Sequence, residues 1–266
     1  MKDIIAQRQG YVVKANKFIQ QSRYNLTMQQ QRILLYLIAQ IQPDQTEFQE
    51  TELSIIDFCE LCGIGGKNYA DIKAAVKSLA DCSFWMEYED KSKLVRWIAS
   101  YPAPVVEKNS GIIRLKLSDS LRDYLLQLRE RFTVYELQWV LAFRHRYSIR
   151  LYEYVCSRHY DGMKPYTFAV PVDELMAIMG ATAYKRFADF HCKCLAPSVA
   201  EIDTMTDKSL SYELKKRGKT VTAIQFTIST QPDFERIRRD SDIQHRLGID
   251  PDQQTLWDEM TEKGYV

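Results

Sequence analysis

The 266-residue sequence has no apolar run that approaches the roughly 20 residues needed to span a bilayer. Its first residues also contain no hydrophobic stretch of signal-peptide length. We therefore expect a cytoplasmic protein with no membrane partner. The six cysteines also fall far short of the content of a disulfide-rich protein, and a chain of this size folds without disulfide bonds. We expect reduced, mostly buried thiols at Cys59, Cys62, Cys82, Cys156, Cys192 and Cys194.

An excess of charge of one sign is also missing, since the net charge is only +1. With 45% hydrophobic and 27% charged residues, the composition is that of an ordinary soluble globular protein and names no function. The charges are unevenly distributed, however. Residues 131–230 hold 14 basic and 10 acidic residues, whereas residues 231–266 hold 5 basic and 9 acidic residues. A net charge near zero therefore hides a basic segment that suits an acidic partner.

Histidine is rare, and this scarcity bears on catalysis. No two of the four histidines are separated by one residue, as they are in rolling-circle nickases, which cut DNA through a tyrosine. Such enzymes also need a metal or a polar cluster to stabilise the transition state. A tyrosine-dependent nickase stays an alternative, but we expect Tyr152 and Tyr154 to be ordinary residues of a helix. The sequence predicts no catalytic residue and no enzymatic activity.

Two cysteine groups have spacings that occur in zinc sites. A zinc site needs four ligands that converge in tetrahedral geometry. Cys59 and Cys62 continue an apolar helix, whereas Cys192 and Cys194 point to different sides of another helix. We therefore expect packed thiols, no metal site and no cofactor.

The glycine-rich residues 63–68 resemble a phosphate-binding loop before a helix. The nucleotide-binding pattern needs glycine at the position of Leu61 and serine or threonine at the position of Asn68, so we exclude an ATP site. Asn68 can instead cap the following helix. Lys67, together with the free N–H groups at that helix start, can bind a DNA phosphate.

The sequence does contain one arrangement twice. A short apolar helix that ends in glycine is followed by a loop, a tyrosine, an amphipathic helix and a pair of strands. The helices of the first copy are residues 56–63 and 69–80, and those of the second are residues 174–180 and 184–202. Two helices joined by a tight turn present one helix to the major groove of DNA. The repeat predicts an α+β protein with two tandem winged-helix domains related by pseudo-symmetry.

In the first copy, Ile72, Val76 and Leu79 define the inner face of the second helix, and Lys73 and Lys77 lie on another side. Residues 83–88, 94–100 and 111–117 are rich in aromatic and β-branched residues, which predicts strands. Residues 90–93, with Lys91 and Lys93, are expected to form the turn of the first wing.

In the second copy, helical spacing places an apolar set on one side of residues 184–202, namely Phe187, His191, Cys194, Leu195, Ser198 and Ile202. The opposite side holds Lys185, Asp189, Cys192, Lys193 and Ala196, with Arg186 at its flank. Strands 209–214 and 220–228 enclose a predicted turn that carries Lys215, Lys216, Arg217 and Lys219. A basic helix face beside a basic hairpin suits phosphates and guanine, although a solvated surface helix is the alternative.

Four further predictions concern the connections and the tail. Thr27 can cap a helix that ends near residue 41, and Ser118 can cap a helix over residues 119–130. Thr133 with Glu136 forms a capping-box pattern that would open a helix of the second domain. Residues 231–266 have weak helical periodicity, and the sequence leaves open whether they pack as a short helix or remain mobile.

Over residues 12–229 the sequence resembles the theta-type plasmid replication initiators that bind iterons and contain two winged-helix domains. The resemblance is carried by Leu-Thr-Met-Gln-Gln-Gln-Arg-Ile-Leu at residues 26–34, Phe-Thr-Val-Tyr at 132–135 and Tyr-Ser-Ile-Arg-Leu-Tyr-Glu at 147–153. It continues through Tyr184, Phe187 and Phe190, residues 195–202, and residues 212–226. Lys193 stands where the family usually has arginine, and lysine lacks the two-pronged fit to guanine.

This resemblance implies a replication initiator without catalytic activity. Family members bind direct repeats of double-stranded DNA at a plasmid origin as monomers, open AT-rich DNA with a host initiator and help to load the host helicase. Dimers repress their own gene at an inverted repeat. We expect residues 1–130 to contact DNA and dimerise, residues 131–230 to dominate recognition, and residues 231–266 to form an acidic tail. A tandem winged-helix transcriptional repressor is the main alternative.

Overall fold

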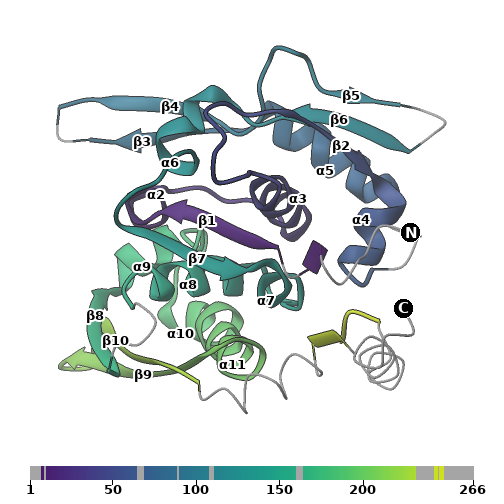
Figure 1. Ribbon diagram of the computed structural model, residues 1–266. Coiled ribbons are helices and arrows are strands. Elements are labelled where there is room, and N and C mark those ends of the chain that lie inside the picture. The colour runs from purple at the N-terminus through teal and green to yellow at the C-terminus, as the bar shows by residue number, and fades with distance from the viewer. Residues whose placement is uncertain are drawn as a thin grey trace.

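The computed structural model describes residues 7–8, 10–64, 69–88, 90–107, 111–159, 164–231, 243–244 and 246–248. Figure 1 shows two units, one above the other, that meet at a two-stranded sheet in the centre of the molecule. Among these residues, no helix is both long enough and apolar enough to cross a membrane.

The upper unit in Figure 1 combines a helical layer with two small antiparallel sheets. Its helices are α2 (Asn16–Gln21), α3 (Met28–Ala39), α4 (Ile55–Leu61), α5 (Tyr69–Asp81) and α6 (Arg122–Leu125). One sheet has the strand order β2 (Glu50–Ser54), β6 (Ile112–Lys116) and β5 (Val105–Val106). β3 (Ser83–Glu87) and β4 (Ser92–Arg96) form a hairpin. Helices α4 and α5 with this hairpin match the first predicted helix pair and wing, except that Lys93 lies on β4 and not in the turn.

Helix α3 forms as the sequence predicts because its first turn carries its own cap. The Thr27 hydroxyl accepts a hydrogen bond from the Gln30 N–H, and the Gln30 side chain accepts one from the Thr27 N–H. This reciprocal pair satisfies two donors that the helix start leaves open. Ile33, Leu34 and Leu37 are then buried in the core.

The lower unit has a three-stranded antiparallel sheet against a helical layer. Its sheet has the order β8 (Tyr166–Pro171), β10 (Thr220–Thr230) and β9 (Lys208–Arg217). Its helical segments are α9 (Val172–Ile178), α10 (Phe187–Phe190), the π-helical η3 (His191–Leu195) and α11 (Ala196–Met205). The second predicted helix pair is therefore present, but the second helix begins at Phe187 and leaves Lys185 and Arg186 just before it.

Two predicted features of this unit need correction. Strand β9 runs on to Arg217, so the turn consists of Gly218 and Lys219 alone, and the three cations before them belong to the strand. Gly218 has a φ of 63°, a value that glycine adopts at little cost and that this tight turn requires. The predicted continuous α-helix is interrupted by η3 because Pro197 has no N–H to donate to the carbonyl group one turn earlier, at Lys193.

The central sheet joins segments that are far apart in the sequence. β1 (Tyr11–Ala15) pairs antiparallel with β7 (Phe132–Glu136), and α7 (Leu137–Leu141) and α8 (Arg146–Cys156) follow. Thr133 was expected to open a helix, but it lies in β7 and its hydroxyl donates to the Asn16 side chain at 2.6 Å. A strand forms in place of the predicted helix because pairing with β1 satisfies the backbone hydrogen-bond donors and acceptors along the whole segment.

The helix predicted over residues 119–130 is also much shorter than expected. Ser118 does cap it, by accepting a hydrogen bond from the Ser120 N–H, but the helical segment consists only of η2 (Asp119–Leu121) and α6. Gln127 and Arg131 both have φ values of 50°, outside the helical region. These two turns redirect the chain so that β7 can lie beside β1.

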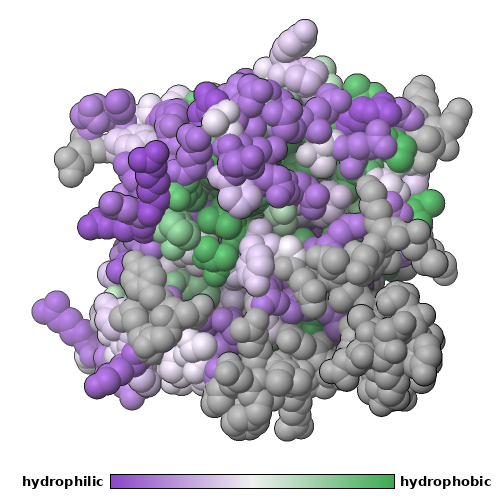
Figure 2. Space-filling model, viewed as in Figure 1, coloured by the Kyte–Doolittle hydropathy of each residue, from purple (hydrophilic) through white to green (hydrophobic). Residues whose placement is uncertain are grey.

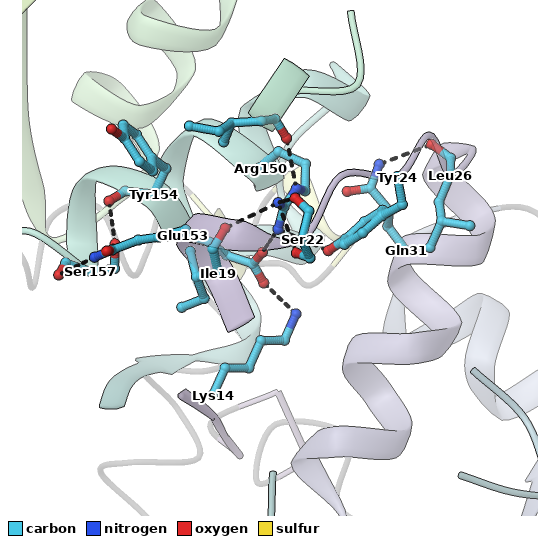
Figure 3. Close-up of polar contacts among 12 residues, drawn as sticks. Lys14, Ile19, Ser22, Tyr24, Leu26, Gln31, Arg150, Glu153, Tyr154 and Ser157 are labelled. Carbon is cyan, nitrogen blue, oxygen red and sulfur yellow. Dashed lines mark hydrogen bonds and ion pairs between the residues drawn. The ribbon is translucent and has the colours of Figure 1, made fainter. Parts of the chain in front are cut away.

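A buried group of charges lies at the junction of the two units (Figure 3). The Glu153 carboxylate of α8 accepts hydrogen bonds from Lys14 Nζ at 2.5 Å, Tyr135 OH at 2.6 Å and Arg150 Nη1 at 3.0 Å. Arg150 also donates to the Tyr24 hydroxyl. Because every member has partners, the group can remain charged inside a largely apolar core that runs through both units.

The described part of the tail packs against both units. Ile243 and Leu247 are buried, and the Arg8 guanidinium donates to the Gln244 side chain and to the carbonyl groups of Leu61 and Leu247. For residues 243–244 and 246–248, the structure thus answers the question that the sequence left open in favour of packing. Apart from Gln231, the rest of the predicted acidic tail lies outside the described residues.

Candidate nucleic-acid interface

The start of the second helix of the second pair (α10, η3 and α11, here called the second recognition helix) presents two cations joined by one carboxylate. Asp189, in the first turn of α10, accepts from Arg186 Nε at 2.7 Å and from Arg186 Nη2 at 3.2 Å. Lys193 Nζ lies 3.5 Å from the same carboxylate. The side chains of Arg186 and Lys193 are 77% and 63% exposed, whereas that of Asp189 is 27% exposed. The cations therefore project outward from an acid at their base.

The opposite side of this helix holds it in the core, as the sequence predicts. Cys194, Leu195, Ser198 and Ile202 are buried, while Phe187 and His191 are half-buried. His191 Nε2 and Tyr212 OH are 2.8 Å apart, which ties the helix to β9. On the outward side, Lys185, Cys192 and Lys193 are exposed, and Asp189 and Ala196 are half-buried. The η3 segment thus keeps the predicted division into two faces.

The second wing is a long hairpin whose tip is basic. Lys215, Lys216, Arg217 and Lys219 are all exposed. Lys215 pairs with Glu213 at 2.8 Å, and both side chains are open to solvent, so the pair leaves the lysine accessible. In Figure 2, hydrophilic side chains protrude at the lower left, where Figure 1 places the tip of β9 and β10. The basic tip therefore protrudes from the protein and is accessible to a binding partner.

In the first unit the predicted cations have more partners within the protein. Lys73 is half-buried, lies 4.5 Å from the centre of the Tyr69 ring and donates to the Glu107 carbonyl at 3.4 Å. Lys93 lies 3.6 Å from the Asp123 carboxylate. Lys77 and Lys91 are exposed. The predicted contacts Lys67 and Asn68 lie outside the described residues.

The first wing also carries an exposed apolar pair that was not predicted from the sequence. Trp85 on β3 lies directly opposite Leu94 on β4, and the two residues are 57% and 39% exposed. Phe84 and Met86, on either side of Trp85, are buried. The alternation of side chains along a strand would have placed Trp85 on the outer face.

The described residues offer little support for metal or tyrosine chemistry. They contain no group of three or more His, Cys, Asp or Glu residues that could hold a metal ion. Burial raises the pKa of the Cys62 thiol to about 12. Burial also raises the pKa of Tyr152, whose hydroxyl donates to Asp207 at 2.7 Å. Tyr152 and Tyr154 are both buried, so neither hydroxyl is displayed at the surface.

Comparison with known proteins agrees with this geometry. Residues 11–156 match the family described as "Initiator Replication protein, WH1", and residues 171–228 match "Initiator Rep protein, WH2". The chain is 24% identical over 226 residues to an Escherichia coli protein described as "Replication initiation protein", with 82% of this chain and 69% of that protein covered.

Among solved structures, the chain resembles the Pi initiator protein in complex with iteron DNA, with a TM-score of 0.65 and 20% identity. The match covers 85% of this chain and 99% of that one. These matches confirm the predicted resemblance and the α+β fold with two winged-helix domains. The chain belongs to the initiator replication protein family and contains its WH1 and WH2 domains in that order.

Proposed function

We propose that the protein is a plasmid replication initiator that binds repeated double-stranded DNA sites at an origin. One observation carries this proposal: the second recognition helix and the second wing both display exposed cations, and each belongs to the WH2 domain. A winged-helix unit places such a helix in the major groove, about 12 Å wide. The similar Pi initiator protein has been solved in complex with iteron DNA, which supports the same interpretation.

The domains would divide this work. Residues 131–230, with Lys185, Arg186, Asp189, Lys193 and the wing cations, would dominate recognition of the repeat. Residues 1–130 would add contacts from the α5 helix and the first wing and would carry the dimer interface. Monomers on direct repeats would open the origin with a host initiator and load the host helicase. Dimers on an inverted repeat would repress the gene.

Footprinting of the purified protein on the DNA that flanks its own gene tests this role. Protection of several direct repeats is the expected result. A single protected palindrome across a promoter would instead identify a transcriptional repressor. A tyrosine-dependent nickase would convert supercoiled DNA, in the presence of Mg²⁺, into relaxed circles attached to protein. The proposed initiator should yield no such circles.

A double variant of the wing tests how the cations act. Lys216→Gln with Arg217→Gln should weaken binding to all duplexes alike, because phosphate contacts carry no sequence information. The slope of log K against log salt should become shallower by about 0.9 for each lost phosphate contact. Fluorescence anisotropy over a salt series measures both quantities.

The matched control removes two other exposed cations, Arg129 and Arg131, from the connection between α6 and β7. Arg129→Gln with Arg131→Gln makes the same change in net charge, and its salt slope should remain close to that of the unaltered protein. Equal slopes for both double variants would show that the wing does not lie on the phosphates.

A further inference from the structure

The negative charge of the Asp189 carboxylate is unexpected on a surface that we propose binds DNA. It is the only acid within α10 and η3, and it lies between two cations at the start of the helix. The N-terminal residues of a recognition helix approach the base edges most closely. A carboxylate there repels phosphates, so it weakens general attraction to DNA. Asp189 must therefore have a role in this helix other than to increase affinity for DNA.

The geometry of the Arg186 pair indicates that role. Asp189 engages the guanidinium from its side, through Nε and Nη2. A guanidinium has five N–H groups in a planar fork. A side-on carboxylate therefore leaves the other edge, formed by Nη1 and Nη2, with two parallel N–H groups directed outward. That edge matches the O6 and N7 acceptors of guanine in the major groove.

The carboxylate also fixes the direction of that edge. A free arginine loses rotamer entropy when it is ordered on DNA. Arg186 is 77% exposed yet already held by two hydrogen bonds to a carboxylate that is only 27% exposed. Hydrogen bonding from Arg186 also lowers the pKa of Asp189, so the carboxylate remains charged at neutral pH. Lys193 contacts the same group and is a point charge without a fork.

We infer that Arg186 and Asp189 form a guanine-reading pair, in which Arg186 contacts the base and Asp189 is the positioning residue that determines specificity. This inference rests on the proposed function. It assigns the two-pronged contact to Arg186, at the helix start, and leaves Lys193 as a phosphate or single-acceptor contact. Asp189 would then lower affinity for unrelated DNA while raising discrimination.

The test uses the whole 266-residue chain and a duplex that it selects from a random pool. Each base pair of that duplex is substituted in turn, and binding is measured by anisotropy. Asp189→Asn should raise affinity for unrelated duplexes a few-fold and reduce discrimination at one guanine by about tenfold, the worth of a bidentate contact. Replacing that guanine by 7-deazaguanine, which lacks the N7 acceptor, should weaken the unaltered protein but not Arg186→Lys.

Glu213→Gln is the matched control, because it removes one negative charge beside a wing cation and leaves the helix untouched. It should raise affinity for all duplexes by one factor and preserve the preference for guanine. If Asp189→Asn behaves in the same way, Asp189 is merely a charge and the inference is wrong. Arg186→Lys keeps both charge and fold, so it decides the matter if Asp189→Asn fails to fold. No salt-sensitive binding by the unaltered protein would instead refute the proposed function.

Discussion

At the scale of single residues, Glu153 shows how a charge can be stable inside this protein. Burial by itself would raise the pKa of this carboxyl. The attraction of Lys14 and Arg150, with hydrogen bonds from Lys14 and Tyr135, outweighs burial and lowers the pKa below its ordinary value of 4.5. The carboxylate therefore connects β1 to α8 by charge-assisted hydrogen bonds.

Glu153→Gln should therefore destabilise the protein strongly. The variant leaves Lys14 with a buried charge and a neutral neighbour, and removal of one partner from a buried pair costs about 3–5 kcal/mol. Chemical denaturation measures the loss in the free energy of unfolding. Glu52→Gln is the control, because the Glu52–Arg114 pair is exposed and such pairs contribute about 1 kcal/mol or less. Equal losses for the two variants would contradict this account of the junction.

Glu153 should also make the stability of the protein depend on pH. A carboxyl whose pKa is lower in the folded state stabilises that state at pH values above its unfolded pKa. This contribution is lost as the pH falls below about 4.5 and through the lower pKa of the folded protein. Denaturation at a series of acidic pH values should show a steep loss of stability that Glu153→Gln makes shallower.

Cys192 offers a probe of the recognition helix. It is exposed next to Lys193, whereas among the other cysteines only Cys82 is not buried. In a Cys82→Ala background, a thiol reagent should therefore modify Cys192 first. Cognate DNA should slow this reaction in proportion to the fraction of protein bound, because the duplex would cover the thiol. An unchanged rate on fully bound protein would place the helix away from the groove.

At the scale of elements, the sequence predicted well those elements that depend on neighbouring residues. It predicted poorly a strand that pairs with a distant segment. Helix α3 depends on Thr27, Gln30 and its own apolar spacing, all within a dozen residues, and it was predicted correctly. Strand β7 depends on β1, and the Thr133–Asn16 hydrogen bond joins residues that are 117 positions apart. No local pattern reveals such a partner, so the capping-box pattern at Thr133 misled the prediction.

The recognition helix illustrates an intermediate case. Helical spacing correctly divided its buried and exposed faces, because the apolar side chains pack on the core. The π-helical segment was missed although the sequence contained its signal, a proline within a predicted helix. The contact between Asp189 and Arg186 depends on rotamers, which the sequence does not reveal. The DNA-contact residues as a set remain a prediction.

At the scale of the whole molecule, Gly63 joins the first helix pair to the tail. Its φ is 61°, and a Cβ atom there would lie 2.7 Å from Leu247 Cα. Gly63→Ala should therefore be strained in its backbone and should also displace residues 243–244 and 246–248. Denaturation should show lower stability, and limited proteolysis should show faster cleavage near Leu247.

Gly218→Ala is the matched control, because Gly218 has a φ of 63° and no atom lies within 4 Å of a Cβ built there. The free energy of unfolding of this variant should fall only by the backbone cost, about 1–2 kcal/mol. A Gly63→Ala variant that loses no more than this, with cleavage of the tail unchanged, would show that the Leu247 contact contributes nothing.

The β1–β7 pairing restricts how this protein can be divided for study. A fragment beginning at residue 131 would carry β7 without β1, and its open edge would invite pairing with a second molecule. The Lys14 ammonium would be missing as well, so Glu153 would face an incomplete set of donors. Such a fragment is expected to aggregate, and addition of a synthetic peptide of residues 10–22 should restore a soluble species.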